Sequence, residues 1–468
     1  MIVLFSVANF RSFDAEETFS SVAGKHLSTH QTHVIPIPDT TAQVLKTSVL
    51  YGANGAGKSN LFKALRYLKM LALKPRPKNS GTGREVFRFA ENTFEQPSRF
   101  DLQFITQDKL YRFGCAVTDK HVIEEWLVQI IGGEEKIVYE RITDEDGKVT
   151  IEAREAKKIG KKFAALVTVG GPQNQTFLAT IRATLDKGDY GEKISAVLAW
   201  FEDSLTLIAP NESSRTLGAK LADDSAFREF AGTFLKASAT GVETIKAQKQ
   251  EISEEALYSL LPKSLVSRLL DDEDENGKAF VQFGNKELLI ERSDKNHYYR
   301  LIIQTEHKHH KEKLINLDLS EESDGTRRLL NLIPILHYSR NAVYFIDEID
   351  RSMHPMLAWK FLEFFLKSAV EGQRQIIVTT HESNLLDLDL LRRDEIWFAE
   401  KNSNGATHLY SLSDFKPRKD LDIRKHYLQG RFSAIPFLGN LEHLLLKQNE
   451  PYSAQTQTTE SGCCRFSG

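Results

Sequence analysis

A glycine-rich segment at residues 52–59, with the sequence GANGAGKS, has the residue types and the spacing to hold a triphosphate. It matches the pattern G-x4-G-K-[ST] in full, which about two in a hundred chains of this length would do by chance. Backbone N–H groups of such a loop converge on the β-phosphate, and its glycines let the backbone come close. Lys58 is placed to neutralise the β- and γ-phosphates, and Ser59 to offer a hydroxyl to Mg²⁺. The nucleotide contacts expected here are Gly52, Asn54, Gly55, Gly57, Lys58, Ser59 and Asn60.

Two apolar runs further along the chain end in residues suited to hydrolysing such a ligand. The run at 343–348, VYFIDE, reads as a buried strand that ends in two carboxylates. Asp347 would bind Mg²⁺ or its water, and Glu348 would polarise the attacking water. The second run, at 375–381, ends in His381, and a helical segment lies between the two runs. This strand–helix–strand order lets His381 reach the γ-phosphate. ATP and Mg²⁺ are therefore the expected cofactors, with Glu348 and His381 as catalytic residues.

The elements next to the glycine-rich loop can be read from local patterns. A β-rich run at 44–50 precedes the loop, and a helix is expected from residue 60 to about residue 71. Two prolines in the following KPRPK sequence end that helix. The first 13 residues read as an edge strand that turns at Ala8 and Asn9.

Later segments change from strand patterns to helical ones and back. Residues 98–142 alternate apolar and polar positions, which predicts an antiparallel β subdomain. Residues 150–275 carry helical faces, and strand-like runs return at 280–283, 288–291 and 298–304. An acidic run at 271–275 reads as a solvated loop. We divide the chain into the first half of an α/β head with its β subdomain (1–145), a helical insertion (146–278), the second half of the head (279–446) and a disordered tail (447–468).

The composition favours a protein of the cytoplasm. The chain has 468 residues, a net charge of −3 and three cysteines, Cys115, Cys463 and Cys464. So few cysteines argue against a disulfide framework, and the charge gives no overall attraction to nucleic acid or membrane. No segment approaches the roughly 18 apolar residues that a membrane span needs. The N-terminal residues read as a strand rather than as a signal peptide.

The order of these motifs resembles that of ABC-type ATPases of the SMC/RecF/OLD group, including its AAA15/AAA21-type members. The sequence ESDGT at 322–326 is similar to the signature motif of the group, with Ser323 and Gly325 at the essential positions. Glu322, Asp324 and Thr326 stand where transporters have leucine, glycine and glutamine. The sequence NFRSF at 9–13 is similar to the opening motif, whose Arg11 and Ser12 approach the nucleotide, and SMHP at 352–355 lies at the D-loop position. For the Q-loop glutamine, Gln96 and Gln103 both remain open.

The resemblance implies the fold class α/β, with an ABC-type P-loop ATPase head, an antiparallel β subdomain and a helical insertion. It also implies a homodimer or higher homo-oligomer. In that assembly ATP lies between the phosphate loop of one copy and Ser323 and Gly325 of the other.

Three further segments resemble bacterial stand-alone ATPases of anti-phage defence. They lie at 391–398, 409–415 and 430–436, and the PARIS ATPase subunit is the best match, followed by the ATPases of Septu and retron-linked systems. This resemblance implies a sensor or scaffold that controls a separate toxic effector, such as a Toprim- or HNH-type nuclease.

Two other functions compete with this interpretation. A RecF-like ATPase would bind DNA, and two basic stretches could contact its backbone. They consist of Lys63, Arg66, Lys69, Lys74, Arg76, Lys78 and Arg84, and of Lys157, Lys158, Lys161 and Lys162. A metal-dependent nuclease could use the cluster His307, His309 and His310, but no carboxylate pattern follows it, so we interpret it as a polar hairpin. Cys463 and Cys464 have no spacing suited to zinc.

Overall fold

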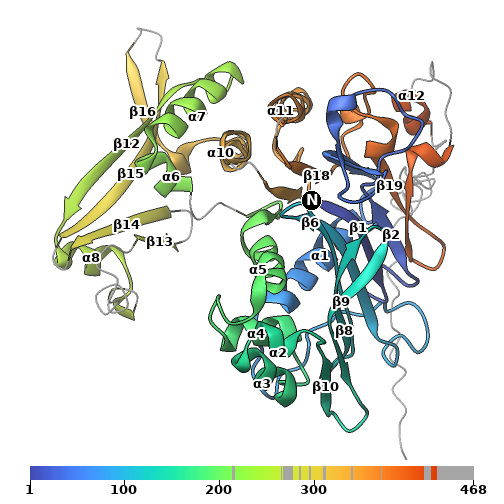
Figure 1. The fold of residues 1–468 in the computed structure, drawn as a ribbon. Helices are drawn as coiled ribbons and strands as arrows, with labels where there is room; N and C mark the ends of the chain where they lie inside the picture. The colour runs from blue at the N-terminus through green and yellow to red at the C-terminus, as the bar shows by residue number, and fades with distance from the viewer. Residues whose placement is uncertain are drawn as a thin grey trace, which may run out of the picture.

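The protein forms a head from which a second part, the arm (residues 217–318), extends to one side (Figure 1). The structure, a computed structural model, describes residues 1–212, 217–264, 266, 278–283, 286–294, 297–308, 313–338, 341–369, 372–415 and 423–429. Five of the predicted features lie outside the described residues. They are the acidic run 271–275, the histidines His309 and His310, the motif at 430–436, the tail 447–468 and the cysteines Cys463 and Cys464.

A six-stranded sheet forms the centre of the head. Its order is β11 (Leu205–Ile208), β17 (Val343–Ile346), β18 (Gln375–Thr379), β5 (Thr47–Tyr51), β19 (Ile396–Lys401) and β20 (Thr407–Ser411). The first five strands are parallel, and β20 is antiparallel to β19. Strands β17, β18 and β5 are buried along their whole length, as expected for a parallel sheet covered on both faces. Because these three strands are parallel neighbours, the segments that follow them meet at one edge of the sheet.

Helices follow the strands as the apolar spacing predicts. Helix α1 (Lys58–Leu73) begins directly after the glycine-rich loop, and its last residue precedes the Lys74–Pro75 step. Helix α11 (Pro355–Ser368) connects β17 to β18, which confirms the strand–helix–strand unit. Helix α10 (Asp324–His337) begins at the ESDGT motif.

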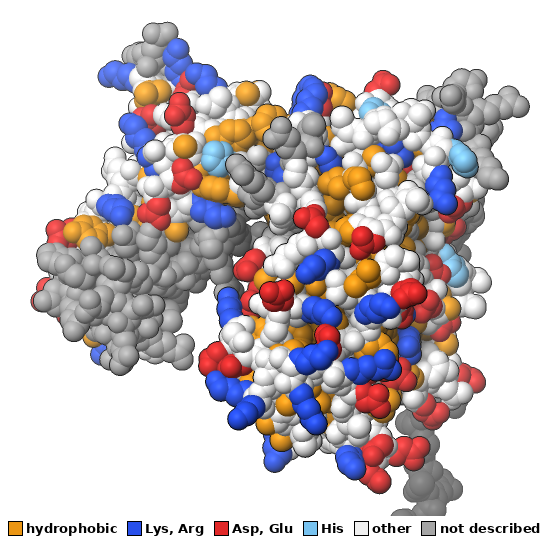
Figure 2. Space-filling model, in the orientation of Figure 1, with side chains coloured by type: hydrophobic (Ala, Val, Ile, Leu, Met, Phe, Trp, Pro, Cys, Tyr) orange, Lys and Arg blue, Asp and Glu red, His pale blue; other side chains and the backbone are white. Residues whose placement is uncertain are grey.

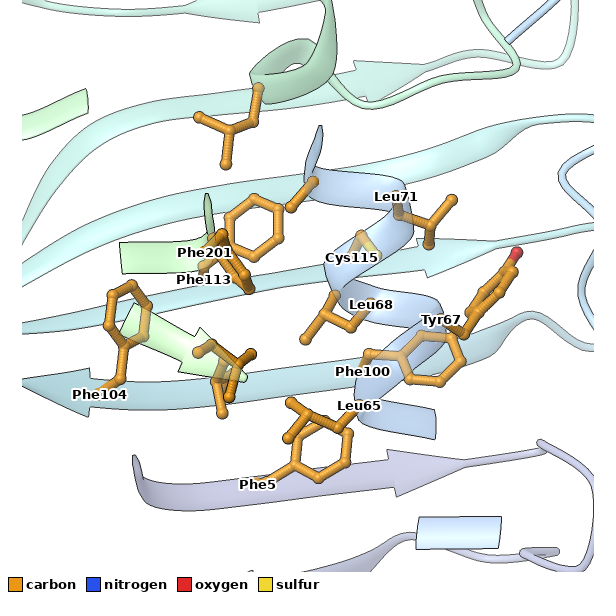
Figure 3. Close-up of a cluster of buried hydrophobic side chains, with 14 of the residues drawn as sticks. Phe5, Leu65, Tyr67, Leu68, Leu71, Phe100, Phe104, Phe113, Cys115 and Phe201 are labelled. Atoms are coloured by element: carbon orange, nitrogen blue, oxygen red, sulfur yellow. The ribbon is translucent and has the colours of Figure 1, made fainter. Parts of the chain in front are cut away.

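A second, seven-stranded sheet packs against α1. Its order is β10 (Val149–Glu152), β9 (Glu134–Thr143), β8 (Val122–Ile131), β7 (Lys109–Val117), β6 (Ser98–Thr106), β1 (Ile2–Ala8) and β2 (Glu17–Ser20). All its pairs are antiparallel, which confirms the predicted β subdomain. Figure 3 shows Leu65, Leu68 and Leu71 of α1 against the aromatic side chains of this sheet. Each such buried side chain contributes about 1.5–3 kcal/mol, so α1 is held firmly between the two sheets.

The prediction that the chain starts with an edge strand is wrong. Strand β1 lies inside the sheet, because it pairs with β2 on one side and with β6 on the other. Its residues Ile2, Val3, Phe5 and Val7 are all buried. The partner β6 lies about ninety residues further along the chain, so no local pattern could show that both sides of β1 are paired.

The segment predicted as a helical insertion contains helices and also strands. Among the described residues of this segment, the helices are α2 (Ala156–Ile159), α3 (Lys161–Val169), α4 (Phe177–Thr184), α5 (Gly191–Ala199), the π-helical turn η2 (Trp200–Ser204), α6 (Leu217–Asp223), α7 (Ser225–Ala237) and α8 (Glu254–Leu260). The strands are β10, at one end of the seven-stranded sheet, β11, which joins the central sheet, and β12 (Val242–Ile252), and β13 (Lys278–Phe283) begins at the last residue of the segment. Strand β12 carries so many charged residues that its pattern did not indicate a buried face. The division of the chain into four parts stays a prediction.

The arm is built on antiparallel strands. Strand β12 pairs with β15 (His297–Lys308), which also pairs with β14 (Lys286–Asp294) and β16 (Leu314–Asp318), and β14 pairs with β13 (Lys278–Phe283). Helix α7 connects the arm to the head, since Phe227 contacts His337 and Tyr338 at the end of α10. The remaining elements are η1 (Gln31–His33), β3 (Val34–Pro36), β4 (Gln43–Leu45), η3 (Leu319–Glu321), η4 (Ser383–Leu385), η5 (Arg393–Glu395), η6 (Leu412–Phe415) and α12 (Ile423–Leu428).

None of the helices in the described part of the chain has the length and apolar character that crossing a membrane would require.

Candidate functional site

The glycine-rich loop runs from the end of β5 to the start of α1, as the motif requires. Gly57 precedes the helix with a φ of 109°, and a Cβ there would overlap the Thr407 hydroxyl. Lys58 is 7% exposed, and its Nζ donates to the carbonyl oxygens of Gly52 at 2.6 Å and Ala53 at 3.0 Å. Burial lowers the pKa of Lys58, while the carboxylates of Asp350, Asp347 and Glu348 act in the opposite direction. The ammonium group therefore lies folded onto the loop in which it would meet a phosphate.

Ser59 and Asp347 meet at the edge of the central sheet. The Ser59 hydroxyl donates to Asp347 Oδ1 at 3.0 Å, and the Thr379 hydroxyl donates to the same oxygen at 2.6 Å. Burial raises the pKa of Asp347, and these two hydrogen bonds oppose that shift. A carboxylate and a hydroxyl are oxygen donors of the kind that Mg²⁺ takes from proteins, with water and phosphate completing its shell. The residues present thus fit a magnesium ion.

Glu348 follows Asp347 in a strained backbone conformation, with a φ of 50°. Its N–H donates to the Thr379 hydroxyl oxygen at 2.8 Å, so one threonine holds both acidic residues. The Glu348 carboxylate is about one-third exposed and forms an ion pair of 3.3 Å with Arg351. A non-glycine residue in the left-handed region costs of order 1–3 kcal/mol and persists where the surroundings enforce it, often at functional sites.

Arg328 of α10 ties the signature helix to the acidic strand end. Its side chain is buried, and its Nη2 donates to the carbonyl oxygens of Asp347 at 3.2 Å and Glu348 at 3.3 Å. Its Nη1 donates to the carbonyl oxygen of Ala209, directly after β11, at 3.1 Å. Sequence reasoning missed Arg328, because nothing in its local pattern distinguishes it from Arg327.

His381 lies two residues after β18, next to the end of β17. Its Nε2 is 3.2 Å from Asp350 Oδ2, and its side chain is 56% exposed. Asp350 is buried, and its other oxygen, Oδ1, has no hydrogen-bond partner among the described residues. The structure therefore brings His381 to the same sheet edge as Asp347 and Glu348, where Asp350 holds it.

The opening motif lies beside the phosphate loop. Ser12 Oγ accepts from Asn60 Nδ2 at 2.8 Å and is 2.7 Å from the Thr407 hydroxyl. Arg11, with a φ of 55°, forms an ion pair with Glu85. Thr407 comes from β20, almost four hundred residues away, and only the strand order β5–β19–β20 brings it here.

An open pocket of about 230 Å³ adjoins this side of the loop. Arg11, Ser12, Asn60, Arg88, Phe89 and Lys401 are among its lining residues. The Phe89 side chain is 72% exposed, yet its ring contacts the ring of Phe87 edge-on at 5.7 Å. A Cβ on Gly405 would lie 3.2 Å from the same ring, so the backbone of that turn supports it from another side. The pocket thus presents an exposed aromatic ring that contacts Phe87 and lies near the turn at Gly405.

The signature residues start helix α10 next to the D-loop segment. The Ser323 hydroxyl oxygen accepts from the N–H of Thr326 at 3.1 Å as the N-cap of the helix. A Cβ on Gly325 would lie 2.6 Å from the carbonyl oxygen of Ser352, so only glycine permits this close approach. His354 caps α11 by accepting from the N–H of Met356 at 3.2 Å.

Other predicted residues have less defined surroundings. Asn54 and Gly55 are exposed at the tip of the loop. Gln103 lies within β6, opposite Leu4 and Arg112, whereas the carbonyl oxygen of Gln96 accepts from Asn9 and Arg84. Neither position follows a strand of the central sheet, so the identity of a Q-loop glutamine stays open.

The sequence matches one family model over two segments, residues 48–161 and 188–387. The family is described as "AAA domain, putative AbiEii toxin, Type IV TA system". The matched residues include the phosphate loop, the signature residues, the acidic strand end and His381.

Solved structures of SMC heads are similar to the chain at low identity. The SMC head domain from Thermotoga maritima has 12% identity and a TM-score of 0.36, covering 88% of this chain and 98% of that one. An SMC head bound to the C-terminal winged-helix domain of ScpA has 13% identity and a TM-score of 0.40, covering 89% and 99%. One with an extended coiled coil, bound to the C-terminal domain of ScpA derived from Pyrococcus furiosus, has 13% identity and a TM-score of 0.36, covering 89% and 97%. No curated protein matches the chain.

Proposed function

The chain belongs to this family of AAA-type ATPase domains, AAA_21, and on that premise we propose that it binds ATP with Mg²⁺ and hydrolyses the ATP. The observation that carries the proposal is the hydrogen bond of 3.0 Å between Ser59 and Asp347. It joins the phosphate loop to the acidic strand end through two oxygen atoms of the kind that Mg²⁺ binds. A chance match to the loop motif would not bring that second half of a nucleotide site alongside it.

Each side chain at the sheet edge then has one role. Lys58 leaves the carbonyl oxygens of Gly52 and Ala53 to contact the β- and γ-phosphates, and Glu348 orients and polarises the attacking water. His381 contacts the γ-phosphate, held in place by Asp350. Ser59 and Asp347 would hold Mg²⁺, which would supply positive charge to neutralise the charge that develops on the phosphates.

Two substitutions test this proposal. We expect Lys58→Ala to abolish binding of Mg·ATP, measured by titration calorimetry. We expect Glu348→Gln to keep binding and to slow phosphate release, because the amide cannot accept a proton from water. Wild-type nucleotide affinity in the Lys58 variant would contradict the assignment of the loop.

The nucleotide would lie between two copies of the chain. Ser323 and Gly325 offer a hydroxyl and the N–H groups at the start of a 14-residue helix, which are suited to a γ-phosphate. Their own contacts are with Thr326 and with the Ser352 segment, which leaves them available to the nucleotide of a second copy. ATP would then close a homodimer, or a higher homo-oligomer, and hydrolysis would reopen it. Sedimentation of the Glu348→Gln variant with and without ATP checks this point.

The pocket beside Ser12 would hold the nucleobase. It begins where Asn60 and Ser12 border the phosphate loop, and Phe89 presents an exposed ring on which a base can stack. Arg11 and Ser12 of the opening motif would then contact the sugar and the phosphates.

We further propose what the ATPase controls. The family description names a putative toxin of a type IV toxin–antitoxin system. From the resemblance of the segments 391–398, 409–415 and 430–436 to defence ATPases, we propose a role in bacterial anti-phage defence, as a sensor or scaffold that restrains a separate effector such as a Toprim- or HNH-type nuclease. Cys115 is free and buried, which suits the reducing cytoplasm as the place of action. Co-expression with the neighbouring reading frame tests this role: a toxic partner should copurify and be released when the Lys58→Ala variant replaces the wild type.

A DNA-binding ATPase of RecF type is the second candidate, and the basic side chains give it limited support. Arg84 is buried and donates to three carbonyl oxygens and to Asp119. Lys162 pairs with Asp189, and Arg66 with Glu212, so part of the positive charge is neutralised within the chain. Figure 2 shows Lys and Arg side chains mixed with Asp and Glu over the face of the head in view. A DNA titration with a steep salt dependence would favour this candidate.

A further inference from the structure

Glu322, the residue before the signature serine, has a buried carboxylate that points to the arm. Its side chain is 4% exposed. Its Oε1 accepts from the Thr305 hydroxyl and lies 2.6 Å from Nε2 of His307. A buried carboxylate is costly without such partners, so these contacts fix where the side chain lies. His307, which the sequence suggested to be part of an exposed polar hairpin, is one of the two residues that hold it.

Both partners belong to β15, the strand that connects the parts of the arm sheet. Thr305 and His307 are two residues apart, so they share one face of the strand. Glu306 between them lies on the other face, where it is buried and pairs with Lys246 of β12. Because β15 also pairs with β12, β14 and β16, its position depends on the whole arm sheet. Glu322 is therefore attached to the arm at its structural centre.

The backbone around Glu322 leads directly into the signature residues. The chain leaves β16 at Asp318, which pairs with Gln304 of β15, and makes the single turn η3 before Glu322. Ser323 follows as the N-cap of α10, and Gly325 lies against the Ser352 segment. A shift of β15 would therefore move Glu322, and with it the start of α10.

We propose that Thr305, His307 and Glu322 form a clamp through which the arm positions Ser323 and Gly325 and so controls ATP turnover. The inference rests on the proposed function, in which these signature residues act on the nucleotide held by a second copy. The glycine-rich loop of the same chain holds its own nucleotide through Lys58 and Ser59, which the clamp does not touch. The clamp thus acts on closure and turnover, and it leaves the affinity of a single chain for ATP unchanged. Thr305, His307 and Glu322 are positioning residues, because none of them contacts the nucleotide.

The test compares ATP affinity with turnover in clamp variants of the full chain. The variants are His307→Ala, Glu322→Gln and Thr305→Val, with His307→Gln as the conservative change that keeps an N–H donor. Glu321→Gln is the matched control, because Glu321 is the neighbouring acid but is exposed. The Kd of Mg·ATP is measured at low protein concentration, and kcat at saturating ATP. ATP-dependent dimerisation is measured in a Glu348→Gln background, and thermal unfolding shows that each variant is folded.

We expect the Kd to stay within about twofold and kcat to fall by about tenfold or more, as for loss of a hydrogen bond to a charged group. Dimerisation should weaken in parallel with kcat, His307→Gln should recover part of both, and Glu321→Gln should behave as the wild type. Equal losses in ATP affinity and turnover would overturn the clamp, and so would unchanged turnover in all three variants. If the wild type itself binds no Mg·ATP, it is the proposed function that fails. If His307→Ala does not fold, Thr305→Val and Glu322→Gln decide.

Discussion

The exposed ring of Phe89 gives a prediction that separates recognition of the base from recognition of the phosphates. Phe89→Ala removes a side chain that is 72% exposed and lines the pocket beside Ser12 and Asn60. Because little of the ring is buried, we expect the free energy of unfolding to change by less than about 0.5 kcal/mol. Any larger effect on ligand binding then comes from the pocket itself.

The size of the effect follows from the energy of stacking a base on an aromatic ring. That energy is about 1–3 kcal/mol by alanine substitution, and about 1.4 kcal/mol corresponds to a factor of ten. The Kd of Mg·ATP should therefore rise between about fivefold and about 150-fold. The ring of Phe89 is already supported by Phe87 and by the turn at Gly405, so little ordering has to accompany binding. We accordingly expect a result in the upper half of that range.

The assay is titration calorimetry with two ligands, Mg·ATP and Mg·tripolyphosphate. Tripolyphosphate has no base, so its affinity should be the same for the wild type and for Phe89→Ala, whereas Lys58→Ala should lose both ligands. Phe94→Ala is the matched control, because Phe94 is 62% exposed in the same connection between α1 and β6 but is not among the lining residues. Unchanged ATP affinity in Phe89→Ala would refute the base pocket. An equal loss for tripolyphosphate, or the same loss in Phe94→Ala, would do so too.

Three further predictions concern the edge of the central sheet. Burial raises the pKa of Asp347 in the folded protein, so its contribution to the free energy of unfolding is favourable at low pH and is lost as the pH rises through that pKa. At pH 7 the buried carboxylate is therefore unfavourable, and Asp347→Asn should raise the melting temperature. The same variant should remove the Mg²⁺ dependence of ATP binding. Thr379→Val leaves Asp347 and the N–H of Glu348 each short of a partner, so denaturant titration should show a loss of about 1–3 kcal/mol, and unaltered stability would contradict the bridging role. Arg328→Met removes the hydrogen bonds to the carbonyl oxygens of Asp347 and Glu348, so phosphate-release assays should show a lower kcat while the Kd of ATP stays nearly constant. A parallel loss of ATP affinity would argue against this role of Arg328.

The sequence was sufficient where function depends on consecutive residues. The segment 52–59 and the strand end at Asp347 and Glu348 could be predicted, because strand, loop and helix follow one another within a few residues. The β subdomain could be predicted because residues 98–142 alternate apolar and polar positions. The family resemblance added the opening motif, and the structure brings Ser12 beside Asn60.

Pairing between distant segments limited what could be predicted from the sequence. Thr407 reaches the phosphate loop only because β20 pairs with β19 next to β5, and no local pattern marks it. Strand β11 follows directly on helical turns, so its four residues fell within a helical pattern. Strand β1 is an interior strand because it also pairs with β6, which comes from far along the chain. The partners of Arg328 are backbone carbonyl oxygens, which have no sequence signature.

The guanidinium of Arg328 would couple the two ATP sites of a dimer. It connects the helix that would complete the neighbour's cage to the residues that would cleave the chain's own ligand. Phosphate release at one ATP site would therefore affect both sites, and a dimer that has hydrolysed only one of its two ATP molecules would be short-lived. The rate of ATP hydrolysis would then depend cooperatively on ATP concentration, with a Hill coefficient near two. A simple hyperbolic rate curve for the dimer would show that the two cages work independently.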